Sequence, residues 1–299
     1  MSWISPLKSH KANAFVKKHP ILSPLVAFFA LLFFLNILDS KVGKPQLGIL
    51  PIEGVIMQSD LALKKIKAFK NDSNIKGVII RINSPGGAVA PSQEIYEELL
   101  RLKKIKPVYA SIGTVGASGG YYIAAAADKI YAMPGSLTGS IGVIMQSMNV
   151  AELTKKIGLR FETLKAGKNK DVGNAFRPMT TEERSLLNNL LSETHRQFIA
   201  DVQSQRQLPE AILKEVTDGR VLTGTQAKEV GLVDDLLTFA RVQEQLAHDL
   251  GLGDNFEITY SLDPKERFLK DLEMENLLPS LLGLKTLAPE KGLFYLMDI

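Results

Sequence analysis

Apolar runs of strand length alternate with amphipathic segments of helical length over most of the chain, and this alternation limits the folds open to it. Residues 48–56, 77–82 and 107–112 are apolar runs, whereas segments 61–70 and 92–104 carry apolar residues at helical spacing. Strands joined by helices of about ten to fifteen residues form parallel βαβ units. The sequence therefore predicts an α/β fold with a mostly parallel sheet.

The second half of the alternating region continues the pattern. Segment 158–164 has the composition of a strand, and a polar loop follows it. Thr180 and Glu183 have the spacing of a capping box, which predicts a long helix from there to about residue 205. We find no internal repeat and expect one folded domain.

Residues 21–38 form an uncharged, apolar run. Its length is about the minimum for a helix that crosses a bilayer core of roughly 30 Å. Lysines but no acidic residues precede it, so the positive-inside rule places the N-terminus in the cytoplasm and the rest of the chain on the far side. No small-residue cleavage site follows the run, and it is apolar on all faces, so we favour an uncleaved anchor over a signal peptide or a core helix.

These observations divide the chain into five parts. We expect a cytoplasmic N-terminus (1–20), a transmembrane signal anchor (21–38), a tether (39–46), a catalytic-sized domain (47–252) and a C-terminal tail (253–299).

Composition excludes several classes of site. The chain has no cysteine, so disulfides, thiolate catalysis and Cys-based zinc sites are excluded. None of the four histidines pairs with another at metal-ligand spacing, and neither a P-loop nor a G-x-G-x-x-G motif occurs, so we expect no metal and no cofactor. The net charge of +4 comes from scattered residues, which gives no support to nucleic-acid binding.

Two glycine-rich turns follow predicted buried strands, at residues 83–87 and 116–120. Open α/β sheets bind ligands at the carboxyl ends of their strands. The second turn places Ser118 at the expected start of a helix, between Ala117 and Gly119, where free N–H groups and the helix dipole favour developing negative charge. A serine nucleophile beside an oxyanion hole fits this arrangement, although tight packing or a phosphate site would also use such a turn.

A serine nucleophile needs a base, and histidine is a poor candidate in this chain. His10 and His19 precede the anchor, and we assign structural roles to the two others. The natural substitute is a lysine, whose pKa must fall from about 10.4 to about 7–8 by desolvation and hydrogen bonding. The loop 165–171 offers Lys165, Lys168 and Lys170, and physical reasoning alone leaves these three open.

Four motifs together carry a family resemblance. NSPGG, ASGGYYIAAAADKIYA, SLTGSIGVI and KAGKNKDVGNAFRPMTTEE occur in this order within residues 46–240. In this respect the chain resembles bacterial signal peptide peptidase A in its short form, with one catalytic domain. The resemblance implies a ClpP/crotonase-like fold of stacked ββα units and a serine endopeptidase with a Ser-Lys dyad.

The resemblance also implies roles for individual residues. It points to Ser118 as nucleophile, Lys170 rather than Lys168 as base, Gly87 and Gly119 as oxyanion donors, and Ser140 as the group that orients the lysine.

Partners and location follow from the same resemblance. It implies a homo-oligomeric ring, suspected to be an octamer, in which serine and lysine come from neighbouring subunits; we further expect the tail after residue 252 to dock at subunit contacts. The implied substrates are remnant signal peptides, and the implied location is the bacterial inner membrane with the catalytic domain on the periplasmic side. Two other functions stay open: a crotonase-like acyl-CoA enzyme, and a non-catalytic membrane-anchored scaffold.

Overall fold

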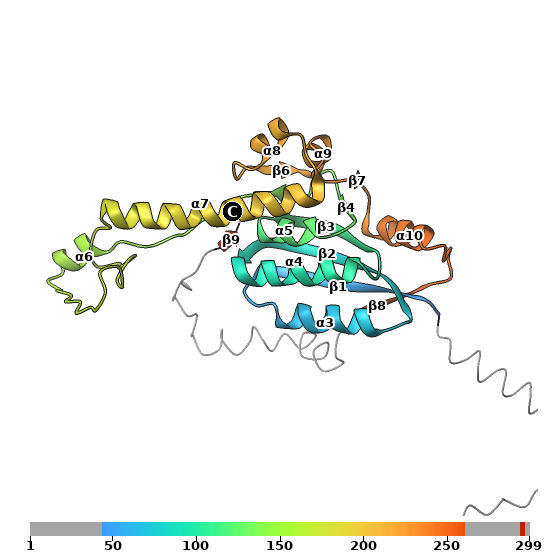
Figure 1. The fold of residues 1–299 in the computed structure, drawn as a ribbon, viewed down its shortest axis with the longest axis horizontal. Coiled ribbons are helices and arrows are strands. Elements are labelled where there is room, and N and C mark those ends of the chain that lie inside the picture. The colour runs from blue at the N-terminus through green and yellow to red at the C-terminus, as the bar shows by residue number, and fades with distance from the viewer. Residues whose placement is uncertain (1–43, 261–293, 297–299) are drawn as a thin grey trace, which may run out of the picture. The chain divides into compact units, whose positions relative to one another are not determined.

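A computed structural model describes residues 44–260 and 294–296, and the chain from Pro45 onward forms one compact unit. Figure 1 shows its elements in order. The predicted cytoplasmic N-terminus, the predicted anchor and most of the predicted tether lie outside the described residues. Within the described part, no helix has both the length and the apolar character needed to cross a membrane.

One sheet organises the described residues. Its main path runs in the order β6-β5-β3-β2-β1-β8, while β4 pairs with β3 and with β7, and β9 pairs with β2. The strands are β1 (Gln46–Ile56), β2 (Ile75–Ala88), β3 (Val108–Ala117), β4 (Lys129–Ala132), β5 (Leu137–Gly139), β6 (Val221–Thr223), β7 (Asp235–Leu236), β8 (Glu257–Tyr260) and β9 (Phe294–Leu296).

The central strands are parallel, as the alternation of strands and helices predicted. β2 pairs in parallel with both β1 and β3, whereas the pairs β5–β6 and β2–β9 are antiparallel. The helices are α3 (Asp60–Asn71), α4 (Val89–Lys103), α5 (Gly119–Ala125), α6 (Ala151–Lys156), α7 (Thr181–Arg206), α8 (Glu210–Val216), α9 (Gly224–Glu229) and α10 (Phe239–Asp249).

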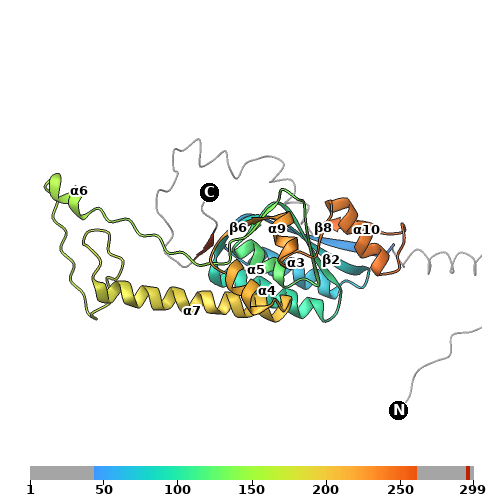
Figure 2. The same cartoon turned by 90° about the horizontal axis from the view of Figure 1, so that it is seen from above.

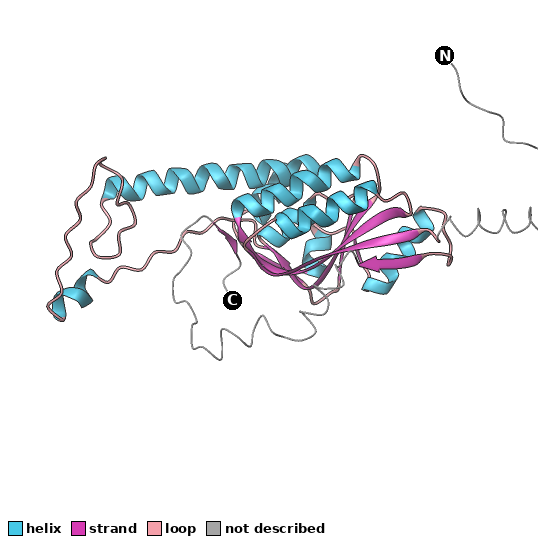
Figure 3. Ribbon diagram, turned by 90° about the horizontal axis from the view of Figure 1, so that it is seen from below, coloured by secondary structure: helices cyan, strands magenta, loops and turns pink. Residues whose placement is uncertain are grey.

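Side chains of the central strands alternate between two apolar clusters, one on each face of the sheet. Val78 and Ile80 join the larger cluster together with side chains of α3, α4, α5 and α7. Ile79 points to the other face, where it packs with Val242 and Leu246 of α10. This period of two explains why the strands read as continuous apolar runs: both faces are covered. Figure 3 shows the larger helical layer along one face of the sheet.

The long helix α7 begins with the predicted capping box. The Thr180 hydroxyl accepts a hydrogen bond from the Glu183 N–H, and the Glu183 carboxylate accepts one from the Thr180 N–H. Near its C-terminal end the helix packs on α5, where the ring centroids of Phe198 and Tyr122 are 4.8 Å apart and the Tyr122 hydroxyl donates to the Asp201 carboxylate. The C-terminal part of α7 therefore belongs to the core.

The segment between β5 and α7 leaves the core and carries α6 and the loop 157–180. Figures 1 and 2 both place α6 and this loop beyond the N-terminal end of α7, away from α5. The prediction of a strand at 158–164 is wrong, because the structure has no strand there and these residues are exposed. Their apolar residues alternate as in a strand, but none of the described strands pairs with them.

The sheet extends past residue 252, where we expected the domain to end. β8 pairs in parallel with β1, and its Ile258 packs against the smaller cluster. Sequence periodicity did not reveal β8 because the strand is only four residues long. The tail thus contributes two strands to the sheet, β8 at one edge and β9 beside the carboxyl end of β2.

Candidate active site

Ser118 occupies the junction between β3 and α5 in a backbone conformation that serine rarely adopts. Its φ is 53° and its ψ is −118°. Such a conformation costs about 1–3 kcal/mol and persists only where the surroundings hold it. A sharp strand-to-helix turn of this kind presents a nucleophilic side chain at the top of a sheet.

The Ser118 side chain is buried without a partner. The residue is 1% exposed, and its Oγ is the only buried side-chain oxygen or nitrogen in the described part of the chain that makes no hydrogen bond. An unsatisfied buried hydroxyl costs about 1–3 kcal/mol. The fold therefore holds a serine hydroxyl away from both water and protein acceptors, as a reactive group awaiting a partner would be held.

The backbone of Ser140 lies beside the backbone of Ser118. The Ser118 N–H donates to the Gly139 carbonyl at 2.8 Å, so the two serines follow a paired position of β3 and β5. Ser140 also has a positive φ, 50°, and its N–H donates to the Arg220 carbonyl at 2.8 Å. The structure thus brings these two predicted site residues together.

The two glycine-rich turns touch each other. A Cβ on Gly120 would lie 2.8 Å from the Ser84 carbonyl oxygen, so the start of α5 packs directly on the first turn. A Cβ on Gly87 would lie 2.1 Å from the Ile56 carbonyl oxygen, so only glycine permits this approach of β2 to β1. Ser84 fixes the turn, because its hydroxyl donates to the Gly54 carbonyl at 2.6 Å and accepts from the Gly86 N–H at 3.1 Å.

Gly119 is the first residue of α5. The first N–H of this helix to return to the turn is that of Tyr122, which donates to the Ser118 carbonyl at 2.8 Å. The N–H groups at the start of a helix have no intrahelical acceptor. Gly119 therefore offers a donor directly after the serine.

The strand β9 lies against the first glycine turn. It pairs antiparallel with β2, with Gly86 opposite Leu296, Gly87 opposite Tyr295 and Ala88 opposite Phe294. Addition of an extended segment to a free strand edge is a common mode of peptide binding. An extended peptide segment, here from the chain itself, therefore fits beside Gly87.

Lys170 lies far from Ser118 within one chain. Its loop is fixed to the first turn of α7 by Arg177, which bridges Asp171 and Glu183. From Glu183 the helix runs about 22 Å, at about 1.5 Å per residue, before it contacts α5 at Phe198. The structure therefore does not bring the predicted base to the predicted nucleophile in the same chain.

The three candidate lysines differ in their partners. Lys165 pairs with Asp171, and Lys168 pairs with Glu182 at 2.6 Å. Lys170 is exposed, and within the described ranges its amine has no hydrogen bond and no ion pair. Of the three, Lys170 is thus the lysine whose amine contacts no hydrogen-bond or ion-pair partner among the described residues.

Neither histidine in the described residues forms a hydrogen bond with the Ser118 hydroxyl. His195 Nε2 lies 3.1 Å from the Ile141 carbonyl oxygen and ties α7 to the segment after Ser140. His248 is exposed beside Asp249. No group of three or more His, Asp or Glu residues in the described part could hold a metal ion.

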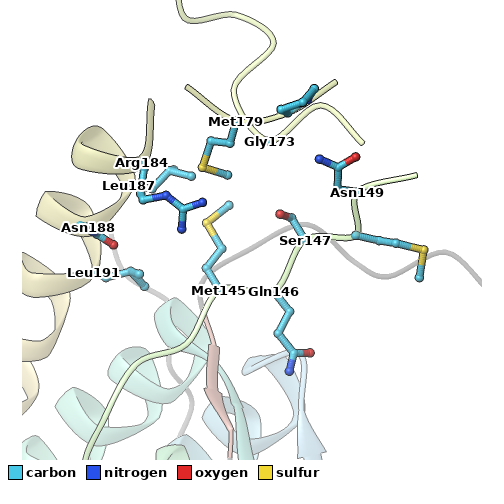
Figure 4. A pocket seen from close by; sticks show the side chains of 12 residues that line it. Met145, Gln146, Ser147, Asn149, Gly173, Met179, Arg184, Leu187, Asn188 and Leu191 are labelled. Atoms are coloured by element: carbon cyan, nitrogen blue, oxygen red, sulfur yellow. The ribbon is translucent and has the colours of Figure 1, made fainter. Parts of the chain in front are cut away.

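A pocket of about 850 Å³ opens between residues 145–149, the segment 173–179 and α7. In Figure 4 the side chains of Met145, Met179 and Leu187 point toward its interior, and Arg184 lies beside Leu187 on the α7 side. Met148, which also lines it, is 73% exposed. This part of the chain therefore presents apolar side chains that its own core does not cover.

Comparison with known proteins gives the family. Residues 100–253 match the model of peptidase family S49. The chain belongs to this family. It is therefore a serine protease, which the paired glycine turns around a buried serine also fit.

The relatives agree with this assignment. A Synechocystis protein named as a candidate protease is 40% identical over 204 residues, which are 68% of this chain and 73% of that protein. An Enterococcus faecium protein named as a candidate signal peptide peptidase SppA is 35% identical over 202 residues, covering 67% of this chain but only 59% of that protein.

A solved structure gives the fold. It is a serine-to-alanine mutant of the membrane-bound stomatin-specific protease 1510-N, with a TM-score of 0.50 and 17% identity over 74% of this chain and 99% of that chain. At this identity the likeness concerns the mixed α/β fold alone.

Proposed function

We propose that this chain is a membrane-anchored endopeptidase that uses Ser118 and Lys170 as a dyad, with the two residues supplied by neighbouring copies of the chain. The observation that carries the proposal is the buried Ser118 hydroxyl, which has no hydrogen-bond partner among the described residues. A nucleophilic serine needs an adjacent base. The exposed, unpaired Lys170 is the complementary half.

Assembly of several copies accounts for both the unpaired serine and the exposed lysine. The loop that carries Lys170 lies beyond the core, and apolar side chains on this part of the chain, such as Phe161 and Leu164, are half or fully exposed. Large exposed apolar patches mark interaction surfaces. In a closed ring each copy offers one surface to its neighbour, so the loop of one protomer can reach the Ser118 turn of the next. The eight-subunit ring and the ClpP/crotonase-like stacking are part of this proposal.

The proposed chemistry assigns one role to each of these groups. The neutral Lys170 amine takes the Ser118 proton as Oγ attacks the peptide carbonyl, and the N–H groups of Gly87 and Gly119 hold the oxyanion. The lysine ammonium then gives its proton to the leaving amine, which leaves an acyl-enzyme. Water attacks the ester with Lys170 again as base, and the acid departs as Ser118 regains its proton. Ser140, beside Ser118 on the backbone, orients the lysine.

The substrates that we propose are remnant signal peptides and other short apolar peptides at the membrane. The uncharged run 21–38 supports an anchor, and the lysines before it support a cytoplasmic N-terminus with the catalytic domain on the periplasmic side of the bacterial inner membrane. An anchored site stays beside substrates that remain in the bilayer.

Active-site labelling tests the proposal. The purified full-length chain in detergent is treated with a fluorophosphonate, and cleavage of a synthetic signal peptide is followed in parallel. We expect the probe on Ser118, and we expect Ser118→Ala and Lys170→Ala to lose both labelling and cleavage while Lys168→Ala keeps both. Full activity of Lys170→Ala, or labelling of another serine, would contradict the assignment.

A further inference from the structure

One arginine connects the loop that carries Lys170 to the start of α7. Arg177 Nε donates to the Asp171 carboxylate at 2.9 Å, and its Nη2 donates to the Asp171 backbone carbonyl at 3.2 Å. Its Nη1 donates to Glu183 Oε2 at 2.9 Å, and Nη2 also contacts the other oxygen of Glu183. Asp171 directly follows Lys170, and Glu183 belongs to the capping box of α7. The guanidinium therefore holds the residue next to the lysine against the first turn of a rigid helix.

Other contacts also order this loop, among them the ion pair of Lys168 with Glu182 and a hydrogen bond from Asn174 to Thr163. Phe161 stacks on Phe176 with ring centroids 3.7 Å apart, and Lys165 adds an ion pair to Asp171. The Lys170 backbone N–H donates to the Gly167 carbonyl at 3.2 Å, while residues 158–170 are exposed throughout. The contacts of Asp171, the next residue, are thus among those that fix the position of Lys170.

We propose that Arg177 is a positioning residue for Lys170: it fixes the loop on α7 and occupies the carboxylate of Asp171, which would otherwise pair with the lysine ammonium. This inference rests on the proposed role of Lys170 as base. A planar guanidinium can bridge a carboxylate, a carbonyl and a second carboxylate at once, whereas a lysine ammonium cannot reproduce that fork.

The charges around Asp171 support the second half of the proposal. Arg177 and then Lys165 hold the pKa of Asp171 well below its usual range, and Arg177, with the Thr180 N–H, lowers the pKa of Glu183 to about 2. Groups with lowered pKa values stay ionised until the pH falls through those values. Both carboxylates therefore stay ionised at neutral and alkaline pH.

That persistence makes the pH profile informative. Lys168 and Glu182, the other charged pair between this loop and α7, satisfy each other. If Arg177 is removed, Asp171 keeps its negative charge with only Lys165 beside it, and a nearby carboxylate favours a protonated amine. A change in the pH–rate profile near neutrality then reports the lysine base rather than titration of the carboxylates.

The test compares Arg177→Gln, Arg177→Lys and the double variant Arg177→Gln/Asp171→Asn in the full-length, assembled protein. The matched control is Arg196→Gln, which removes an α7 arginine. Within residues 44–260, that arginine forms its ion pair with Glu193 on the same helix. For each variant, kcat and KM for a synthetic signal peptide are measured on the assembled fraction from size exclusion. The pH runs from about 6 to 10, the range over which a lysine base titrates.

We expect Arg177→Gln to lower kcat by about 100-fold, because a misplacement of about 1 Å can have that effect, with KM nearly unchanged. Its activity should rise only at higher pH than in the wild type. Arg177→Lys should recover the pH profile but little of kcat, and the double variant should restore the pH profile while kcat stays low. Arg196→Gln should match the wild type.

Two results separate failure of this inference from failure of the proposed function. If Lys170→Ala is inactive while assembled Arg177→Gln keeps the wild-type kcat and pH profile, the positioning role of Arg177 is wrong and the dyad stands. If Lys170→Ala is active, the dyad itself is wrong. A loss of assembly in Arg177→Gln with normal kcat in the assembled fraction would also overturn the positioning role.

Discussion

Replacement of Ser118 by alanine should stabilise the protein when Lys170 is absent. The Ser118 hydroxyl is buried and has no hydrogen-bond partner in the part of the chain that the structure describes. In a Lys170→Ala background it also lacks the partner that we propose from a neighbouring copy. Alanine keeps the positive φ, so the backbone strain remains and the change reports the hydroxyl alone.

The expected gain follows from the desolvation of that one hydroxyl. An unsatisfied buried polar group costs about 1–3 kcal/mol, and each kcal/mol corresponds to about 2–4 °C in Tm for a domain of this size. Ser118→Ala should therefore raise the Tm of the Lys170→Ala protein by several degrees. In the wild-type background the gain should be smaller, because the hydroxyl would there lose a hydrogen bond to the lysine.

Differential scanning calorimetry at one fixed protein concentration measures both effects. Ser136→Ala is the control, because its buried hydroxyl donates to the Gly113 carbonyl at 2.5 Å and accepts from the Met133 N–H at 3.0 Å. That variant should lower Tm, since it removes both hydrogen bonds of a buried hydroxyl and leaves the Gly113 carbonyl and the Met133 N–H without this partner. If Ser118→Ala lowers Tm as much as Ser136→Ala does, Ser118 has a structural partner and the reasoning fails.

Three further outcomes follow from other parts of the fold. Gly87→Ala should abolish cleavage and cost about 1–3 kcal/mol of stability, because its Cβ would meet the β1 backbone at 2.1 Å. Gly135→Ala, whose Cβ would have no atom within 4 Å, should do neither, and measurements of activity and Tm test both variants. Deletion of residues 294–299 should lower KM for peptides if β9 competes for the edge beside Gly87, whereas deletion of 297–299 should not, as steady-state kinetics would reveal. Hydrogen bonds from a tyrosine hydroxyl and a lysine ammonium lower the pKa of Asp249, so Asp249→Asn should reduce Tm at pH 7. In thermal scans at decreasing pH, the Tm difference between variant and wild type should shrink below about pH 4 and vanish once the pH falls through the lowered pKa.

The sequence predicts the core of this fold well because both determinants are local. Periodicity of apolar residues marks the buried strands β1, β2 and β3, and the Thr180–Glu183 pair marks the start of α7. The junction at Ser118 was also predictable, since a strand-like run followed by Gly-rich residues and a helix can only turn sharply there.

Other features depend on contacts that periodicity does not encode. The strand predicted at 158–164 fails because a strand needs a partner edge, which the chain does not bring there. β9 was missed because its pairing with β2 joins residues about two hundred positions apart. The bridge by Arg177 joins residues only six positions away on either side, but a loop has no periodicity that would reveal it. An arginine just before a capping box, between two acidic residues, is a signal that could have drawn attention to it.

A mixing experiment tests the central claim most directly, namely that one chain supplies Ser118 and another supplies Lys170. Ser118→Ala and Lys170→Ala proteins are each inactive by this account. When they are dissociated, mixed in equal amounts and reassembled, about a quarter of the wild-type rate per protomer should return, because each site needs an intact serine and an intact lysine from a neighbour in a symmetric ring. A mixture as inactive as either parent would contradict a shared site.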